Sequence, residues 1–120
     1  MTKGQVEAKI SEAISKFEID NMGRGPEKIR TMIFQDLIVV RLKDFLSTAE
    51  RSLAQSKEGI DLIKKVRTAL FENSRDSLEQ AVKSIIDVNV VSTYSDVSTK
   101  TGEKIIAIVV DQDIEEKFTK

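Results

Sequence analysis

The chain has no cysteine and no histidine. The absence of cysteine excludes disulfide bonds, thiol redox chemistry and zinc-finger sites. The absence of histidine removes the usual general base at neutral pH and the commonest metal ligand. Any catalysis would therefore depend on carboxylates, on lysines or on the single tyrosine, Tyr94.

Long apolar runs and a strong net charge are also missing. The longest apolar runs, 37–40 and 105–110, are far shorter than the roughly 20 residues that span a bilayer, and the N-terminus lacks the apolar segment of a signal peptide. A net charge of −1 provides no general attraction to nucleic acid or anionic lipid. We therefore expect a cytoplasmic protein with no nucleic-acid partner and no direct membrane insertion, which reaches a membrane only through another protein.

The residues that are present suit one folded domain. The 120 residues are 40% apolar and 32% charged, a composition typical of globular proteins that bury a sizeable core. We expect residues 1–110 to form a single domain and residues 111–120 to form a charged tail.

Three stretches have the apolar spacing or the capping residues of helices. Residues 5–22 carry apolar side chains at helical intervals, and Gly23 and Pro26 are placed to end that helix. Residues 47–50 form a capping box, which predicts a helix that begins at about Thr48. A longer apolar stripe predicts a helix over residues 57–86, with a bend at 73–77, where helix propensity is lowest.

Four segments are rich in β-branched and large apolar residues, and they form two hairpins. Residues 28–34 and 37–42 flank the pair Gln35-Asp36, while residues 88–98 and 103–110 flank a turn that contains Gly102. The element order is thus α-β-β-α-α-β-β. We predict an α+β fold, a two-layer sandwich in which helices pack on one face of a mainly antiparallel four-stranded sheet.

The predicted long helix raises the question of a second copy of the chain. At 1.5 Å per residue it would be about 45 Å long, which is more than a compact domain of this size spans. We expect it to protrude or to form a homodimer contact. The apolar residues predicted for that contact are Ile60, Ile63, Leu70 and Leu78.

The stretch NMGRGPEKIR, residues 21–30, is the strongest candidate site. Phosphate loops run from a strand through glycines into a helix N-terminus, whereas here a helix comes first and a strand follows. Neither the Walker pattern nor the dinucleotide pattern is complete, and a helix end plus a strand start accounts for the glycine and the proline. We predict a site for a partner or an anion, formed by Gly23, Arg24, Gly25, Pro26, Lys28 and Arg30.

Other candidates are weaker. The acidic segment 111–116 begins like a calcium loop but lacks the central glycine, so a solvated tail is favoured. The cationic residues near position 65 have acidic neighbours and few aromatics, which disfavours nucleic-acid binding. A carboxylate-dependent enzyme would need a pocket that gathers two or more of Asp36, Glu50, Tyr94 and Asp96. We assign no catalytic residue, no metal site and no cofactor.

A further pattern extends over nearly the whole chain. Its members are Met22-Gly23-Arg24-Gly25-Pro26, Ile29-Arg30, Asp36, Val40-Arg41-Leu42, Leu46, Thr48-Ala49-Glu50, Leu53, Gly59, Val66-Arg67, Asp96, Ser98-Thr99 and Gly102. The pattern resembles a small bacterial family called MpsC-like, named for a system described as sodium-translocating and membrane-potential-generating. Asn21 and Asp44 depart from it, since an aromatic residue and a glycine are common at those two positions.

The resemblance implies a soluble, single-domain accessory protein, since some members are encoded with membrane cation or inorganic-carbon transport machinery. It carries over no catalytic residues. The leading hypothesis is therefore a non-enzymatic, homodimeric accessory or regulatory subunit of a membrane ion-translocating complex. The alternatives are a module that senses an anion or nucleotide at residues 23–30, and a small carboxylate-dependent enzyme.

Overall fold

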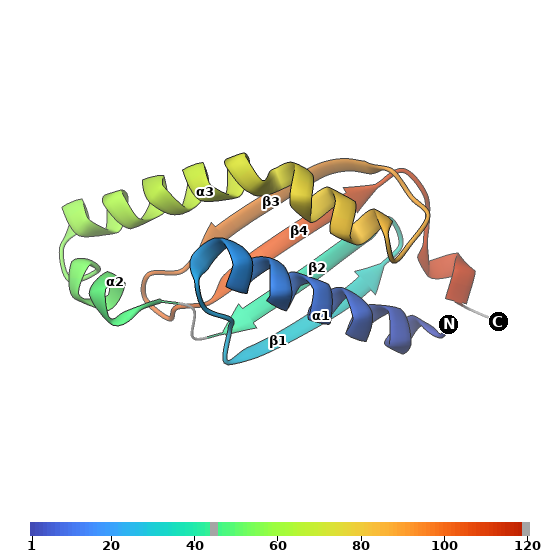
Figure 1. Ribbon diagram of the computed structural model, residues 1–120, viewed down its shortest axis with the longest axis horizontal. Helices are drawn as coiled ribbons and strands as arrows, with labels where there is room; N and C mark the ends of the chain where they lie inside the picture. The colour runs from blue at the N-terminus through green and yellow to red at the C-terminus, as the bar shows by residue number, and fades with distance from the viewer. Residues whose placement is uncertain (44–45, 119–120) are drawn as a thin grey trace.

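A computed structural model describes residues 1–43 and 46–118 of the chain (Figure 1). The predicted α+β class and element order are confirmed. The helices are α1 (Lys3–Met22), α2 (Thr48–Leu53) and α3 (Lys57–Lys83), and a short 3-10 helix spans Glu115–Phe118. The strands are β1 (Lys28–Phe34), β2 (Leu37–Lys43), β3 (Val90–Val97) and β4 (Lys104–Val110).

The four strands form one antiparallel sheet in the order β1-β2-β4-β3. The two hairpins therefore meet at β2 and β4, while β1 and β3 lie at the edges. Gln35 adopts a left-handed conformation, with φ of 57°, in the tight turn that joins β1 to β2. This two-residue turn sets the register of the first hairpin, in which Phe34 faces Leu37 and Lys28 faces Lys43.

The ends of α1 follow from local signals. Thr2 and Gln5 form a reciprocal capping box at its start. At its end Gly23 has a φ of 80° and its N–H donates to the Ile19 carbonyl over 2.9 Å, which is the expected glycine C-cap.

The long helix is unbroken at the place where the sequence predicted a bend. α3 runs without interruption through residues 73–77 and is 27 residues long, which corresponds to about 40 Å. It lies along the long axis of a molecule that measures 50 × 23 × 22 Å (Figure 1). The low helix propensity of residues 73–77 is outweighed by tertiary packing, because Phe71 before them and Leu78 after them are buried in the core.

The main core lies between the sheet and the two long helices, which both cover the same face. Half-buried Val90 of β3 packs against this core. The buried side chains that α1, α3, β1, β2 and β4 contribute to it are Val6, Ile10, Ile14, Phe17, Ile33, Ile38, Val40, Leu42, Phe71, Leu78, Val82, Ile106, Ile108 and Val110. A second, smaller cluster of Leu46, Ile63 and Val97 lies toward the start of α3. Ile114 is fully buried in the main core, so the core extends past residue 110 into the segment we expected to be a charged tail.

Candidate functional site

The loop between α1 and β1 packs back onto its own helix. A Cβ built on Gly25 would lie 3.2 Å from Cγ1 of Ile19, so this glycine allows a close approach to α1. The Arg24 guanidinium donates from Nη1 to the carbonyl of Leu46 over 3.3 Å. Gly23 and Gly25 thus each have a conformational or packing role, and the predicted site residues that point to solvent are cationic: Arg24, Lys28 and Arg30.

The hairpin brings two further cations to Lys28 and Arg30. Across the β1–β2 pair, Lys28 faces Lys43 and Arg30 faces Arg41. All four side chains are exposed, and with Ile29 they line a shallow depression of about 430 Å³. We call Lys28, Arg30, Arg41 and Lys43 the basic cluster.

The basic cluster is electrostatically unfavourable in the chain alone, because like charges directly opposite each other destabilise a strand pair. Arg41 has one carboxylate partner, since its Nη2 lies 2.7 Å from Oε2 of Glu103. For Lys28, Arg30 and Lys43, no ion pair is found with any other residue that the structure describes. The arrangement is suited to anionic groups supplied from outside the chain.

An apolar surface lies beside the basic cluster on the sheet face that carries no helix. One row across the sheet consists of Met32, Val39, Ala107 and Tyr94, and the next contains Phe34, Leu37 and Val109. Phe34 and Tyr94 are 61% and 60% exposed, and Met32 is 40% exposed. We call these rows together with the basic cluster the open face. It combines a cationic end with an apolar end.

The opposite face of the sheet carries buried charges that are paired. Nζ of Lys104 lies 2.7 Å from Oε1 of Glu18, with side-chain exposures of 7% and 0%. The ammonium group is also 5.7 Å from the centre of the Phe71 ring. Burial lowers the pKa of Lys104 below its ordinary 10.5, while Glu18 opposes the shift and Arg67 reinforces it.

A second ion pair lies between α2 and α3. The Arg67 guanidinium donates from Nε and Nη2 to both carboxylate oxygens of Glu50, over 2.8 and 2.7 Å. Burial raises the pKa of Glu50, but the hydrogen bonds from Arg67 and Ser47 outweigh it and hold that pKa below the ordinary 4.5. The predicted capping box is present as well, because the Glu50 side chain accepts from the Ser47 N–H. Glu50 therefore serves as a capping residue and as an ion-pair partner.

Two of the four predicted acid–base residues lie at one groove, which is the minimum set above for a carboxylate-dependent enzyme, and two lie elsewhere. Asp36 lies in the β1–β2 turn, and Asp96 accepts from Nζ of Lys64 over 2.8 Å. Tyr94 and Asp96 both border a groove between α3 and β3, whereas Asp36 and Glu50 do not. Among residues 1–43 and 46–118, no cluster of three or more acidic side chains is placed to hold a metal ion. Asp44, one of the departures from the family pattern, lies outside the described residues.

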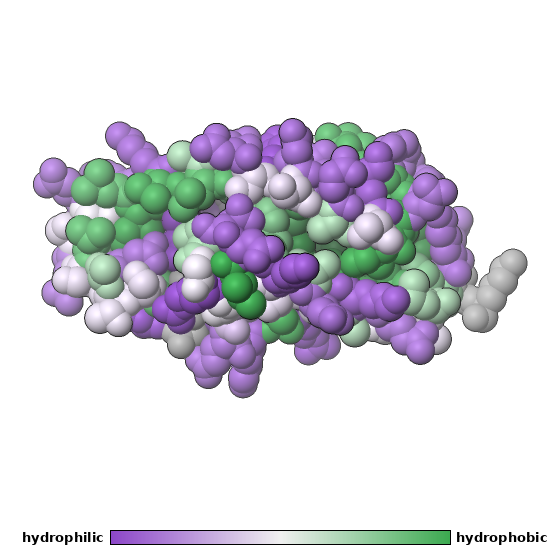
Figure 2. Space-filling view, viewed as in Figure 1, coloured by the Kyte–Doolittle hydropathy of each residue, from purple (hydrophilic) through white to green (hydrophobic). Residues whose placement is uncertain are grey.

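The predicted dimer residues on α3 differ in exposure. Ile63 and Leu78 are 3% and 0% exposed and belong to the core of this chain, while Ile60 and Leu70 are half-buried. The exposed apolar side chains near the start of α3 are Leu53, Leu62 and Val66. Figure 2 shows a hydrophobic area over α2 and the first turns of α3. The most exposed apolar side chains available for a contact in this region are therefore Leu53 on α2 and Leu62 and Val66 on α3.

Arg41 and Lys43 were missing from the predicted site. The signal for them was present, because a two-residue turn at 35–36 places Lys43 opposite Lys28 and Arg41 opposite Arg30. The pairing partners of Lys104 and Arg67 had no such signal in the sequence.

Comparison with known proteins agrees with the resemblance. Residues 2–112 match the family described as "Na+-translocating membrane potential-generating system (MpsC)". The uncharacterized protein YbcI of Bacillus subtilis (strain 168) is 35% identical over 119 residues, covering 99% of this chain and 96% of the relative. The uncharacterized protein YrhF of the same organism is 26% identical over 110 residues, covering 90% and 89%. No solved structure matches significantly.

In the described part of the chain, no helix is both long enough and apolar enough to cross a membrane. The match to the family extends over both hairpins and all three α-helices, so it concerns the whole fold and includes the loop at residues 23–26. The chain belongs to the MpsC family.

Proposed function

We propose that the chain is a non-enzymatic accessory subunit of a membrane cation-translocating system, and that its open face binds an acidic surface of that system. The observation that carries the proposal is the basic cluster, in which Lys28 faces Lys43 and Arg30 faces Arg41 at the edge of an exposed apolar surface. The family description supplies the class of partner, a sodium-translocating, membrane-potential-generating system.

The charge and shape of the open face support this choice of partner. Carboxylates from a partner would relieve the repulsion between the facing cations, and such charge complementarity speeds association and sets orientation. The neighbouring Phe34, Met32 and Tyr94 would supply apolar area at the centre of the contact, where aromatic residues and methionine are enriched. A partner segment with acidic residues followed by apolar residues matches both ends of the face.

The test is recovery of partners from native membranes solubilised in mild detergent, with the tagged chain as bait at low and at physiological salt. We expect the wild-type chain to recover subunits of a cation-translocating complex. The double variant Lys28→Glu/Arg30→Glu should lose them, because it reverses two charges of the basic cluster. The matched control is Lys9→Glu/Lys16→Glu, which reverses two exposed charges on α1 and should retain them.

Two outcomes would contradict the proposal. Recovery of no transport subunit at either salt concentration would remove the accessory role. Equal recovery by Lys28→Glu/Arg30→Glu and by the control would show that docking does not use the open face.

We also propose that the chain forms a homodimer, through the exposed apolar side chains Leu53, Leu62 and Val66. They are 46%, 51% and 56% exposed, and the surface that best complements an uncharged apolar patch is a second copy related by a two-fold axis. Light scattering coupled to gel filtration tests this proposal. The wild-type chain should have the mass of a dimer and Val66→Glu that of a monomer, whereas a monomeric wild-type chain would contradict it.

A further inference from the structure

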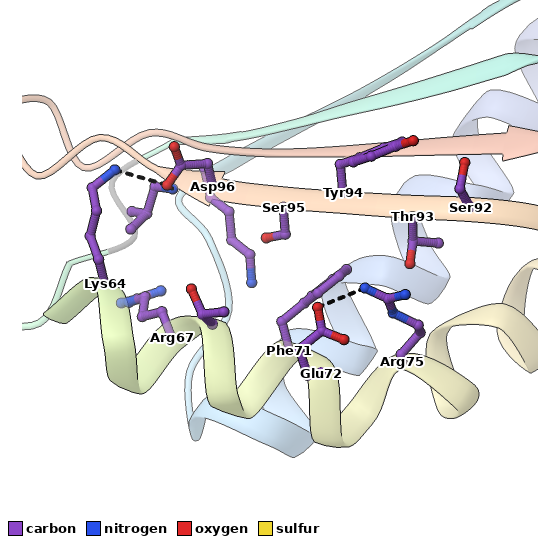
Figure 3. Close-up of a pocket in the computed structure, with 13 residues that line it drawn as sticks. Lys64, Arg67, Phe71, Glu72, Arg75, Ser92, Thr93, Tyr94, Ser95 and Asp96 are labelled. Atoms are coloured by element: carbon purple, nitrogen blue, oxygen red, sulfur yellow. Dashed lines mark hydrogen bonds and ion pairs between the residues drawn. The ribbon is translucent and has the colours of Figure 1, made fainter.

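A groove of about 350 Å³ separates α3 from the edge strand β3 (Figure 3). The pairing of β3 with β4 explains why the groove forms. On β4 the helix-facing positions Ile106 and Ile108 carry large apolar side chains, whereas Ser95 and Thr93 stand opposite them on β3. Because these two side chains are small and hydroxylated, they leave space beneath the helix that isoleucines would have filled.

Two polar atoms in this groove are buried without a hydrogen-bond partner among the described residues: Oγ1 of Thr93 and Nε of Arg75. Thr93 is only 4% exposed. In Figure 3 its hydroxyl points from β3 toward the Arg75 guanidinium on α3. Native proteins rarely leave buried donors unsatisfied, so both atoms point to a partner that comes from outside the chain.

The chemistry of the two atoms limits what that partner can be. The Nε–H of arginine can only donate, and a threonine hydroxyl can donate as well, so one acceptor placed between them satisfies both. Nη2 of Arg75 already lies 2.7 Å from Oε1 of Glu72, which holds the guanidinium in place. The acceptor best suited to a fixed guanidinium is the oxygen of an anion.

The other lining residues define the polarity and the size of the groove. They include four cationic and two acidic residues: Lys64, Arg67, Arg75, Lys104, Glu72 and Asp96. Each of the four cations already pairs with a carboxylate of this chain, so the donors that point to a ligand are Nε of Arg75 and the hydroxyl of Thr93. The ring of Phe71 adds an apolar wall. A volume of about 350 Å³ is within the range of small-molecule sites in proteins.

We propose that the groove between α3 and β3 binds a small organic oxyanion, a carboxylate or a phosphate, whose oxygen accepts hydrogen bonds from Nε–H of Arg75 and from the hydroxyl of Thr93. This site is at the opposite edge of the sheet from β1 and shares no residue with the basic cluster. Of the open face, only Tyr94 also borders the groove, and neither proposed ligand contact involves it, so either proposal can fail without the other.

The experiment is an NMR titration of the ¹⁵N-labelled full chain, which follows the backbone amides and the arginine Nε–H groups. Acetate and inorganic phosphate are the probes, in separate arms, with sodium chloride at the same ionic strength as the blank. We expect saturable shifts at Arg75 Nε–H and at the amides of Thr93 and Ser95, and the arm with the lower Kd identifies the preferred head group.

Thr93→Val removes the hydroxyl with little change in shape and should raise the Kd about tenfold or more, because the lost bond is to a charged ligand. The matched control is Thr31→Val on β1, since Thr31 is also buried but its hydroxyl is 2.7 Å from that of Ser11. The control should lower stability and leave the Kd unchanged. Thr93→Val should keep its stability in the absence of anion.

The proposal would be overturned by the absence of saturable shifts in both arms, which would assign the two buried atoms to water. An unchanged Kd in Thr93→Val, or shifts confined to the basic cluster, would overturn it too.

Discussion

On the helix-covered face of the sheet Lys104 lies 2.7 Å from Glu18, whereas on the open face Arg30 lies directly opposite Arg41. In the first arrangement a buried cation has a carboxylate beside it. In the second arrangement two exposed cations face each other across a strand pair. A buried ammonium without a counter-ion would be strongly destabilising, while an exposed guanidinium is hydrated by water. The comparison indicates that the chain supplies a counter-ion for the Lys104 charge that it buries, whereas exposed Lys28, Arg30 and Lys43 have no ion-pair partner among the described residues.

The largest expected effect comes from breaking the buried pair. Glu18→Gln keeps the shape of the side chain and removes its charge, so Lys104 remains buried without a counter-ion. We expect the free energy of unfolding to fall by about 3–5 kcal/mol. Urea denaturation followed by circular dichroism measures the loss.

A double variant separates charge from packing at this position. Glu18→Met/Lys104→Met replaces the pair with apolar side chains of similar length and should recover most of the stability lost in Glu18→Gln. If Glu18→Gln lowers the free energy of unfolding by less than about 1 kcal/mol, the Glu18 carboxylate is not needed to offset the burial of the Lys104 ammonium.

A smaller and pH-dependent effect is expected at Glu50, which is half-buried. Glu50→Gln should lower the free energy of unfolding by about 1–2 kcal/mol near neutral pH, because it weakens hydrogen bonds to the charged Arg67. The pKa of Glu50 is lower in the folded chain than its ordinary 4.5, so the folded state binds fewer protons than the unfolded state. The stabilisation is therefore complete above about pH 4.5 and is lost as the pH falls through the lower folded value.

The measurement is a pair of urea denaturation series, wild type and Glu50→Gln, from neutral pH down to below pH 4.5. The difference between the two proteins should shrink on the acidic side, because protonated Glu50 resembles glutamine. A difference that stays constant over the whole range would contradict the ion pair with Arg67.

The smallest effect, of opposite sign, is expected on the open face. Arg30→Glu replaces a like-charged pair with an opposite-charged pair facing Arg41, so stability should rise by about 0.2–1 kcal/mol at low salt and by less at high salt. Arg30→Gln is the matched control and should give a smaller gain. A loss of stability in Arg30→Glu would show that the cluster is not repulsive in the free chain.

The secondary structure was largely predictable because its signals are local. The capping box at Ser47–Glu50, the C-cap at Gly23 and the strand at 37–42 each depend on neighbours within a few residues, and all were confirmed. Residues 73–77 have the lowest helix propensity of the long helix, yet α3 continues through them, because propensity ignores the contacts that Phe71 and Leu78 make with the core.

The candidate site was predictable only in part. Lys28 and Arg30 were identified from the chain, and their partners Lys43 and Arg41 follow from the hairpin register. By contrast, Glu18 and Lys104 are 86 residues apart, and no pattern in the sequence relates them. No pattern in the sequence predicts the groove beside β3 either, because the groove forms only where α3 passes over Thr93 and Ser95.

Composition and local spacing alone specify an α+β chain with capped helices, two hairpins and no cysteine or histidine chemistry. They do so because helix caps, turn geometry and strand alternation are decided by residues close together in the chain. Tertiary packing decided which charges are buried and which face water: Lys104 meets Glu18 beneath the helices, and Arg30 remains on the open face. Burial raises the free energy of an unpaired charge, and which side chains are buried depends on how distant elements pack.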